Sequence, residues 1–225
     1  MTSPLTRPAA SAAVEAFGWR YLLGTFCTSV PVPSLAEGAA VAAAAVAACG
    51  AAADAHLRLD VRPTRVELTL QDAAAAHVTQ TDVELARSIT EALGGRTTTG
   101  VTLRPVQMQE IAIDALDIGA IRPFWRAVLA YEDEPGYDGP EDAIVDPARQ
   151  GPTYWFQQMD APRPQRNRIH IDITVPHDEA DARVAAALEA GGHLVSDDEA
   201  RAFWVLADAE GNEVCVCTWQ DRERA

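Results

Sequence analysis

A histidine and two cysteines near the C-terminus lie in stretches that alternate like β-strands. The stretch RIHIDITV puts His170 and Asp172 on one side of a strand and isoleucines on the other. A neighbouring carboxylate can orient an imidazole and tune it for proton transfer, although Asp172 could equally face solvent. The stretch EVCVCTW likewise puts Cys215 and Cys217 on one face. These strands could carry acid–base chemistry or a metal, or the two cysteines could be small buried core residues.

The elements that would position these residues repeat one order: a strand, a helix and further strands. In the first round, strands at 110–116 and 153–159 flank a helix that Asp117 can cap. The second round consists of a strand at 168–175, a helix at 178–190 and strands at 203–208 and 213–219. A unit used twice predicts two modules that close around a shared cleft.

Composition divides the chain into three parts. Residues 1–93 are alanine-rich, residues 94–107 carry the glycines, threonines and proline of a linker, and residues 108–225 have well-defined strands and amphipathic helices. In the first part we expect two strands and two helices, at 19–26, 65–70, 35–56 and 81–93 respectively.

The chain of 225 residues is acidic, with a net charge of −15 and no lysine among its 18 basic residues. That balance disfavours nucleic acid and anionic membranes as partners, since both attract clustered positive charge. The densest apolar run, 35–55, is mostly alanine and is interrupted by glycines and acidic residues, so we expect no membrane span. The N-terminus lacks a secretory pattern and the four cysteines show no CxxC spacing, so we expect a cytoplasmic protein with free thiols.

Residues 109–219 resemble the glyoxalase-like branch of the vicinal oxygen chelate superfamily. The resemblance rests on DIGAIRPFWRAVLAYE, GPTYWFQQM, NRIHIDITVP and DAEGNEVCV, and it covers about half of the chain. It implies two βαβββ modules that form a curled sheet with an internal cleft. In metal-using members, the first and last strands of each module supply His, Gln or Glu ligands. The matching positions here are Glu110, Gln157 or Gln158, His170 and Cys215.

This set implies two kinds of chemistry. With a metal, Glu110, His170 and Cys215 would suit Zn²⁺, whereas Mn²⁺ and Mg²⁺ prefer a carboxylate where the cysteine lies. Without a metal, Glu110 would act as base and His170 as partner acid in an isomerase, epimerase or lyase step. Gln157 or Gln158 would then donate hydrogen bonds to the substrate. The predicted walls of the substrate pocket are Trp125, Tyr154 and Cys215.

Residues 19–93 resemble a degenerate pterin-4a-carbinolamine dehydratase, through WRYLLGTF, ADAHLRLDV, RVELTL and VTQTDVELARSI. In that family's site, His56 would be the second histidine of a His-His-Pro triplet, and Thr79 and Asp82 would begin the last helix. The other two histidines of the site are replaced by Ala55 and Ala73. The resemblance therefore implies a structural or ligand-holding module whose relatives self-associate, with dehydratase activity as an alternative.

Together these features predict an α+β protein in which a dehydratase-like domain (1–93) and a linker (94–107) precede a glyoxalase-like domain of two βαβββ modules (108–225). We expect a homo-oligomer that acts on a small organic molecule in the C-terminal cleft. The alternative functions are sequestration of such a molecule without turnover, and pterin dehydration.

Overall fold

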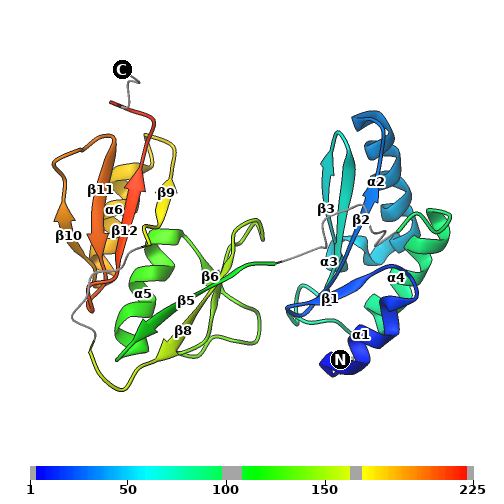
Figure 1. Cartoon of the computed structure of the whole chain (residues 1–225), viewed down its shortest axis with the longest axis horizontal. Coiled ribbons are helices and arrows are strands. Elements are labelled where there is room, and N and C mark those ends of the chain that lie inside the picture. Colours follow the sequence, from blue (N-terminus) through cyan, green and yellow to red (C-terminus); the bar gives the residue numbers. More distant parts are fainter. Residues whose placement is uncertain (1–3, 98–107, 163–168, 222–225) are drawn as a thin grey trace. The chain divides into compact units, whose positions relative to one another are not determined.

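The chain forms two units, Met1–Met108 and Gln109–Ala225, in a computed structural model that describes residues 4–97, 108–162 and 169–221 (Figure 1). The linker expected at 94–107 lies mostly outside the described residues. Its beginning packs as part of the first unit, because Thr97 is buried and its hydroxyl donates a 2.7 Å hydrogen bond to the carbonyl oxygen of Phe17.

The N-terminal unit is a four-stranded antiparallel sheet with helices packed on it. Its elements are α1 (Arg7–Glu15), β1 (Arg20–Leu22), β2 (Thr25–Pro31), α2 (Leu35–Cys49), the 3-10 turn η1 (Gly50–Ala52), α3 (Ala53–His56), β3 (Leu57–Arg62), β4 (Arg65–Leu70) and α4 (Gln80–Ala92). The strand order is β1-β2-β4-β3. Val66, Leu68 and Leu70 alternate along β4 and are fully buried in the core, as the two-residue period predicts.

The sequence prediction missed helix α1 and strand β3 of this unit, and two predicted elements differ from the structure. The stretch 19–26 is a hairpin rather than one strand. Leu23 and Gly24 both adopt positive φ values, 42° and 75°, and turn the chain between β1 and β2. The helix expected over 35–56 is interrupted at Gly50, whose φ of 54° ends α2 before η1 and α3.

One stretch of this unit, Leu35–His56, is long and apolar enough to cross a membrane by length and composition alone. In the structure, α2 lies on the sheet of its own unit and buries Val41 and Ala45 in the core. Gly38 allows this close packing, because a Cβ at that position would come within 3.0 Å of the Val61 side chain. The stretch therefore packs as the core helix of a globular unit.

The C-terminal unit contains the βαβββ order twice. The first module consists of β5 (Glu110–Ala115), α5 (Ile118–Leu129), β6 (Glu132–Asp133), β7 (Ile144–Val145) and β8 (Thr153–Gln158). The second consists of β9 (Asp172–Thr174), α6 (Ala180–Glu189), β10 (His193–Ser196), β11 (Phe203–Ala207) and β12 (Glu213–Cys217). The sheet orders are equivalent, β5-β8-β7-β6 and β9-β12-β11-β10, and in each the first and last strands are parallel. The protein is thus mixed α+β, with a C-terminal unit rich in sheet.

The two modules share one hydrophobic core. Helix α5 packs against α6, and buried residues of both modules form a single cluster. Gly192, which follows α6, permits this contact, because a Cβ there would overlap the ring of Phe124 on α5. The indole Nε1 of Trp125 donates a 2.9 Å hydrogen bond to Oδ2 of Asp208, in the turn before β12. Side chains of one module therefore complete the packing of the other.

Alternation along the strands separates a core side of each sheet from an open side. On β8, Tyr154 and Phe156 are buried in the shared core, whereas Trp155 and Gln157 are exposed. On β12, the valines face the core and Cys215 is only half-buried. The polar residues that could do chemistry thus lie on the open sides of the two sheets.

Candidate functional site

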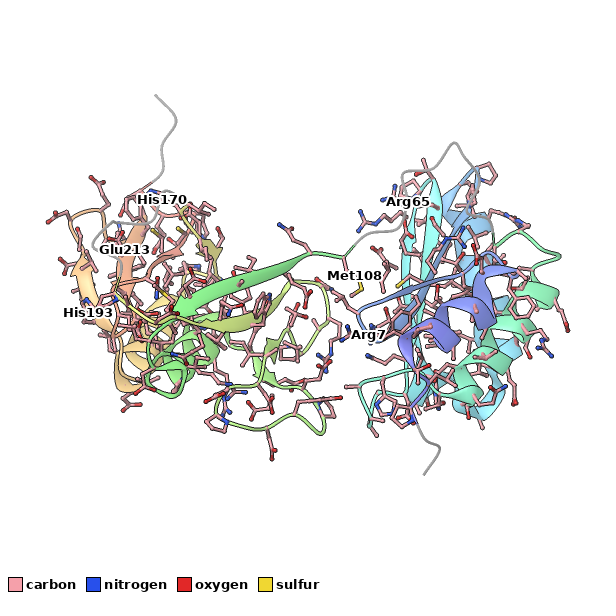
Figure 2. All side chains as sticks on the ribbon, turned by 60° about the horizontal axis from the view of Figure 1, so that its bottom comes forward. Arg7, Arg65, Met108, His170, His193 and Glu213 are labelled. Carbon is pink, nitrogen blue, oxygen red and sulfur yellow. The ribbon has the colours of Figure 1, made fainter. Side chains whose placement is uncertain are left out.

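A pocket of about 320 Å³ lies on the open side of the second module's sheet. Its polar lining consists of His170, Asp172, Glu213, Cys215 and Cys217. Figure 2 shows His170 and Glu213 on this module. The rest of the lining is apolar and comes from Ile169, Ile171, Phe203, Val205 and Val214. Within the part of the chain that the structure describes, the pocket is therefore built by the second module alone.

Strands β9 and β12 bring Asp172 and Cys215 together. The strands are parallel, and their register places these two residues side by side. The backbone N–H of Cys215 donates a 2.9 Å hydrogen bond to the carbonyl oxygen of Ile171, which holds that register. β12 begins after a turn in which the carboxylate of Asp208 accepts hydrogen bonds from two backbone N–H groups.

Burial and, after it, the contact with Asp172 keep the Cys215 thiol protonated. Burial, followed by the negative charge of Asp172 and its hydrogen bond, raises the pKa of Cys215 to about 11. The thiol therefore stays protonated near pH 7 and donates to the carboxylate. Because the thiolate is the form that attacks electrophiles and binds metals, Cys215 serves as a wall of the pocket.

The register of the first module identifies the residues equivalent to this pair. Strands β5 and β8 place Asp114 beside Gln157, as β9 and β12 place their aspartate beside their cysteine. Two residues before the aspartate, the second module has His170 and the first has Ala112. The first module therefore has an alanine at the position where the second has its histidine.

Glu110, the predicted base, lies at some distance from this equivalent position. It begins β5, is exposed and pairs with Thr153, two residues before Ala112 along the strand. Glu110 lines neither this pocket nor the larger cavity described below. Within one chain, Glu110 and His170 therefore line neither of these two cavities together.

The two candidate glutamines point to different places. Gln157 is exposed on the open face together with Trp155. The side-chain amide of Gln158 instead donates a 2.9 Å hydrogen bond to the carbonyl oxygen of Leu116, at the end of the neighbouring strand β5. The register thus favours Gln157 as the glutamine available to a ligand, and Gln158 as a residue that holds the strand ends together.

The predicted metal set does not fit a metal ion within one chain. Among the described residues, no group of three or more His, Cys, Asp and Glu side chains could hold a metal ion. Glu110 belongs to the first module, whereas His170 and Cys215 line the pocket of the second. The raised pKa of the Cys215 thiol also disfavours ligation, which requires the thiolate.

A second cavity, of about 590 Å³, lies where the two modules meet. It is lined by residues of β5, by the 209–213 turn and by Ile169 and Ile171, which also line the first pocket. Trp125, a predicted pocket wall, contributes to this cavity. Tyr154 lines neither cavity, because it is 3% exposed and stacks on Trp125 with ring centroids 5.9 Å apart. Tyr154 is a core residue.

The N-terminal unit brings His56, Thr79 and Asp82 together. Nδ1 of His56 lies 2.8 Å from Oδ1 of Asp82, whose side chain is fully buried. Oδ2 of Asp82 accepts hydrogen bonds of 2.7 and 2.9 Å from the backbone N–H and the hydroxyl of Thr79. These hydrogen bonds provide an acceptor for the backbone N–H of Thr79, the residue before α4. The contact with His56 connects the start of α4 to the end of α3. Nearby in sequence, Nε2 of His77 is buried without a hydrogen-bond partner among the described residues.

Comparison with known families agrees with the repeated topology of the C-terminal unit. Residues 110–217 match the family described as a glyoxalase-like domain. This stretch is a glyoxalase-like domain. The match agrees with the resemblance to the glyoxalase-like branch of the vicinal oxygen chelate superfamily.

Solved structures similar to this glyoxalase-like domain are distant in sequence. A glyoxalase/bleomycin resistance protein/dioxygenase family enzyme from Burkholderia phytofirmans is 17% identical, and the match covers 50% of this chain and 98% of that one, with a TM-score of 0.41. The fosfomycin resistance protein FosX from Mesorhizobium loti is 10% identical, covering 51% and 92%, with a TM-score of 0.40. A glyoxalase/dioxygenase from Nostoc punctiforme is 14% identical, covering 54% and 98%, with a TM-score of 0.39.

A comparison with curated proteins gives no match. None of the similarities found supports a dehydratase-like domain at 1–93, since the family match begins at residue 110. The relation of the first unit to pterin dehydratases therefore stays a prediction.

The contact between Asp172 and Cys215 is the part of the site that sequence reasoning missed. A signal for it exists in the sequence, because IAIDA at 111–115 and IHIDI at 169–173 are copies of one strand. Aligning the copies would have identified Asp114 and Asp172 as the equivalent residues, and Ala112 as the counterpart of His170. Period-two alternation alone does not give that register.

Proposed function

We propose that the glyoxalase-like domain binds a small organic molecule in the pocket of its second module and transfers a proton on it, in an isomerase, epimerase or lyase step. The observation that carries the proposal is the position of His170 in the wall of a pocket that is otherwise largely apolar. Imidazole is the side chain best suited to exchange protons near neutral pH. An apolar pocket with a few convergent polar groups is the usual form of a small-molecule site.

In the proposed mechanism, each role belongs to a side chain of the protein itself. His170 exchanges a proton with the activated carbon or the adjoining oxygen of the ligand. Asp172, two residues along the same face, orients the imidazole or the ligand. The protonated thiol of Cys215 completes the wall.

Self-association is part of the proposal, because it would supply the predicted base. Glu110 and Gln157 lie on the open face of the first module together with Trp155, which is 37% exposed. A second copy that laid this face over the pocket of its partner would place both residues near His170. Mixing a Glu110→Ala chain with a His170→Ala chain tests this arrangement. Recovered activity in the mixture supports sites shared between copies, and inactivity at every ratio contradicts them.

The experiment that tests proton transfer is deuterium incorporation in D₂O. Aryl ketones with an acidic α-proton would be incubated with the full chain and followed by proton NMR. We expect the wild-type protein to accelerate exchange and His170→Gln to lose roughly 100-fold or more of that acceleration. Asp178→Asn is the control, because the Asp178 side chain is 74% exposed and outside the pocket. Equal exchange in the wild type and His170→Gln would exclude His170 as the proton carrier.

Sequestration without turnover is the second candidate function. It is favoured by the five apolar residues of the lining and by the protonated state of Cys215. A protein of this kind would bind the same ketones without accelerating deuterium exchange, and His170→Gln would leave their affinity nearly unchanged.

Pterin-4a-carbinolamine dehydration by the N-terminal unit stays an alternative. What supports it is the ordered contact between His56 and the buried Asp82. What weakens it is the pair of alanines, Ala55 and Ala73, at the other two histidine positions. Dehydration that disappears in full-length His56→Ala would support this function. We also propose, from the four cysteines that are free thiols in the structure, that the protein works in the cytoplasm.

A further inference from the structure

The C-terminal unit carries nearly all of the protein's negative charge. Residues 109–225 contain 24 of the 33 acidic residues but only 10 of the 18 arginines, so this unit has a formal charge of −14 out of −15. A field of this sign concentrates cations near a cleft with apolar walls and repels anions from it. The N-terminal unit, at −1, contributes almost nothing to this field.

The pocket of the second module contains a carboxylate that faces the ligand space. This carboxylate is that of Asp172, which lies two residues from His170 on the same side of the strand. Asp172 is exposed to the pocket and adjoins Cys215 through the register of β9 and β12. The thiol occupies one acceptor position, and a carboxylate offers about four, so Asp172 has room for the donors of a ligand.

The remaining walls define the body of such a ligand. Phe203 and Val205 on β11 line the pocket, together with Ile169 and Ile171, which precede β9. These side chains favour an apolar or aromatic group. A volume of about 320 Å³ accommodates a molecule with one or two rings.

We propose that this pocket selects small organic cations, with an aromatic or aliphatic body against Phe203 and Val205 and a protonated amine on Asp172. The inference rests on the ligand-binding function proposed above and assigns the charge class of the ligand. It also excludes carboxylates and phosphonates of the same size as preferred ligands.

Three indole compounds of similar size and different charge test the selection. Tryptamine is a cation, tryptophol is neutral and indole-3-acetate is an anion at pH 7. Each would be titrated into the full chain at low ionic strength and followed by protein NMR. We expect tryptamine to bind at least roughly tenfold more tightly than indole-3-acetate, with tryptophol between them, and added salt to reduce this difference.

Two variants with the same change in net charge separate the pocket from the general field. Asp172→Asn should remove most of the preference for tryptamine. Asp178→Asn, outside the pocket, should leave that preference within about twofold of the wild type. Tryptophol binding by both variants shows that the pocket is still formed.

The outcomes distinguish this inference from the function on which it rests. Equal binding of tryptamine and indole-3-acetate overturns the cation preference and leaves the pocket as a ligand site. Equal loss of preference in Asp172→Asn and Asp178→Asn overturns the role of Asp172. If none of the three compounds gives a saturable shift, both the proposed ligand-binding function and this inference fail.

Discussion

A histidine and an aspartate can be compared in each unit of the protein, His56 with Asp82 and His170 with Asp172, and the fold holds the two sets in opposite ways. In the N-terminal unit, His56 and Asp82 come from different helices and meet at 2.8 Å in the interior. In the glyoxalase-like domain, His170 and Asp172 are two residues apart along one face and line a pocket. The carboxylate is fully buried in the first pair and exposed in the second.

The two carboxylates differ in how many of their acceptor positions are already used by hydrogen bonds within the protein. Both oxygens of Asp82 are engaged, one by His56 and the other by the backbone and hydroxyl of Thr79. Asp172 adjoins a thiol and opens onto the pocket. A buried carboxylate with satisfied acceptors stabilises its surroundings, whereas an exposed one is available to a ligand. The comparison predicts that the first pair determines stability and the second determines chemistry.

Among the variants that test this comparison, removal of the Asp82 carboxylate should have the largest effect on stability. Asp82→Ala leaves the Thr79 N–H and the His56 ring without their acceptor in a buried site, so we expect the free energy of unfolding of the N-terminal unit to fall by about 3 kcal/mol. Hydrogen exchange of peptides from α4 measures this change. Asp54→Ala, at an exposed position on the adjacent α3, is the control. A loss as large in Asp54→Ala would show that the buried pair is not the cause.

The reactivity of the Cys215 thiol should report the effect of the Asp172 carboxylate in the pocket. Because burial and, to a smaller extent, the negative charge of Asp172 raise the pKa of this thiol to about 11, Asp172→Asn should lower that pKa and increase the rate of iodoacetamide alkylation at pH 8 by roughly threefold to tenfold. In the wild type, the rate should keep rising with pH up to about pH 11. Peptide mass spectrometry identifies the alkylated residue. An unchanged rate in the variant would mean that burial alone raises the pKa.

A smaller effect is expected at Thr79. Thr79→Ala removes the hydroxyl that donates to Asp82 but keeps the backbone N–H that donates to the same oxygen. We expect the N-terminal unit to lose about 1 kcal/mol of its free energy of unfolding. The measurement is the same hydrogen exchange, and Thr79→Ser, which keeps the hydroxyl, should recover most of the loss.

The smallest effect should be the change in stability on altering Asp172. Because this carboxylate is exposed and opens onto the pocket, Asp172→Asn should change the free energy of unfolding of the glyoxalase-like domain by less than about 0.5 kcal/mol. Urea denaturation followed by tryptophan fluorescence measures it. A loss approaching that of Asp82→Ala would abolish the contrast between the two pairs.

Periodicity in the sequence predicted most of the secondary structure. The strand at 65–70 and the repeated order of the second half follow directly from the alternation of apolar residues and from caps such as Asp117. Helix α1 and strands β3 and β10 were not predicted. The hairpin at Leu23 was missed because leucine rarely adopts the positive φ that turns the chain there.

The candidate site was less accessible to sequence reasoning, because it depends on register between strands far apart in the chain. Alternation predicted the faces of His170 and Cys215, and both residues line one pocket. It could not show that Asp172 lies beside Cys215, or that Glu110 is offset by two residues from the counterpart of His170. The two aromatic residues predicted as pocket walls have different positions in the structure. Trp125 lines a cavity, whereas Tyr154 is buried in the core.

The contact of Phe124 with Gly192 has a consequence for how the glyoxalase-like domain responds to heat and to ligands. Because this contact belongs to a core built from both modules, neither module can lose its packing while the other keeps it. The domain should melt in a single transition. A compound that occupies the pocket of the second module should therefore also protect the amide protons of α5, in the first module, from exchange with solvent.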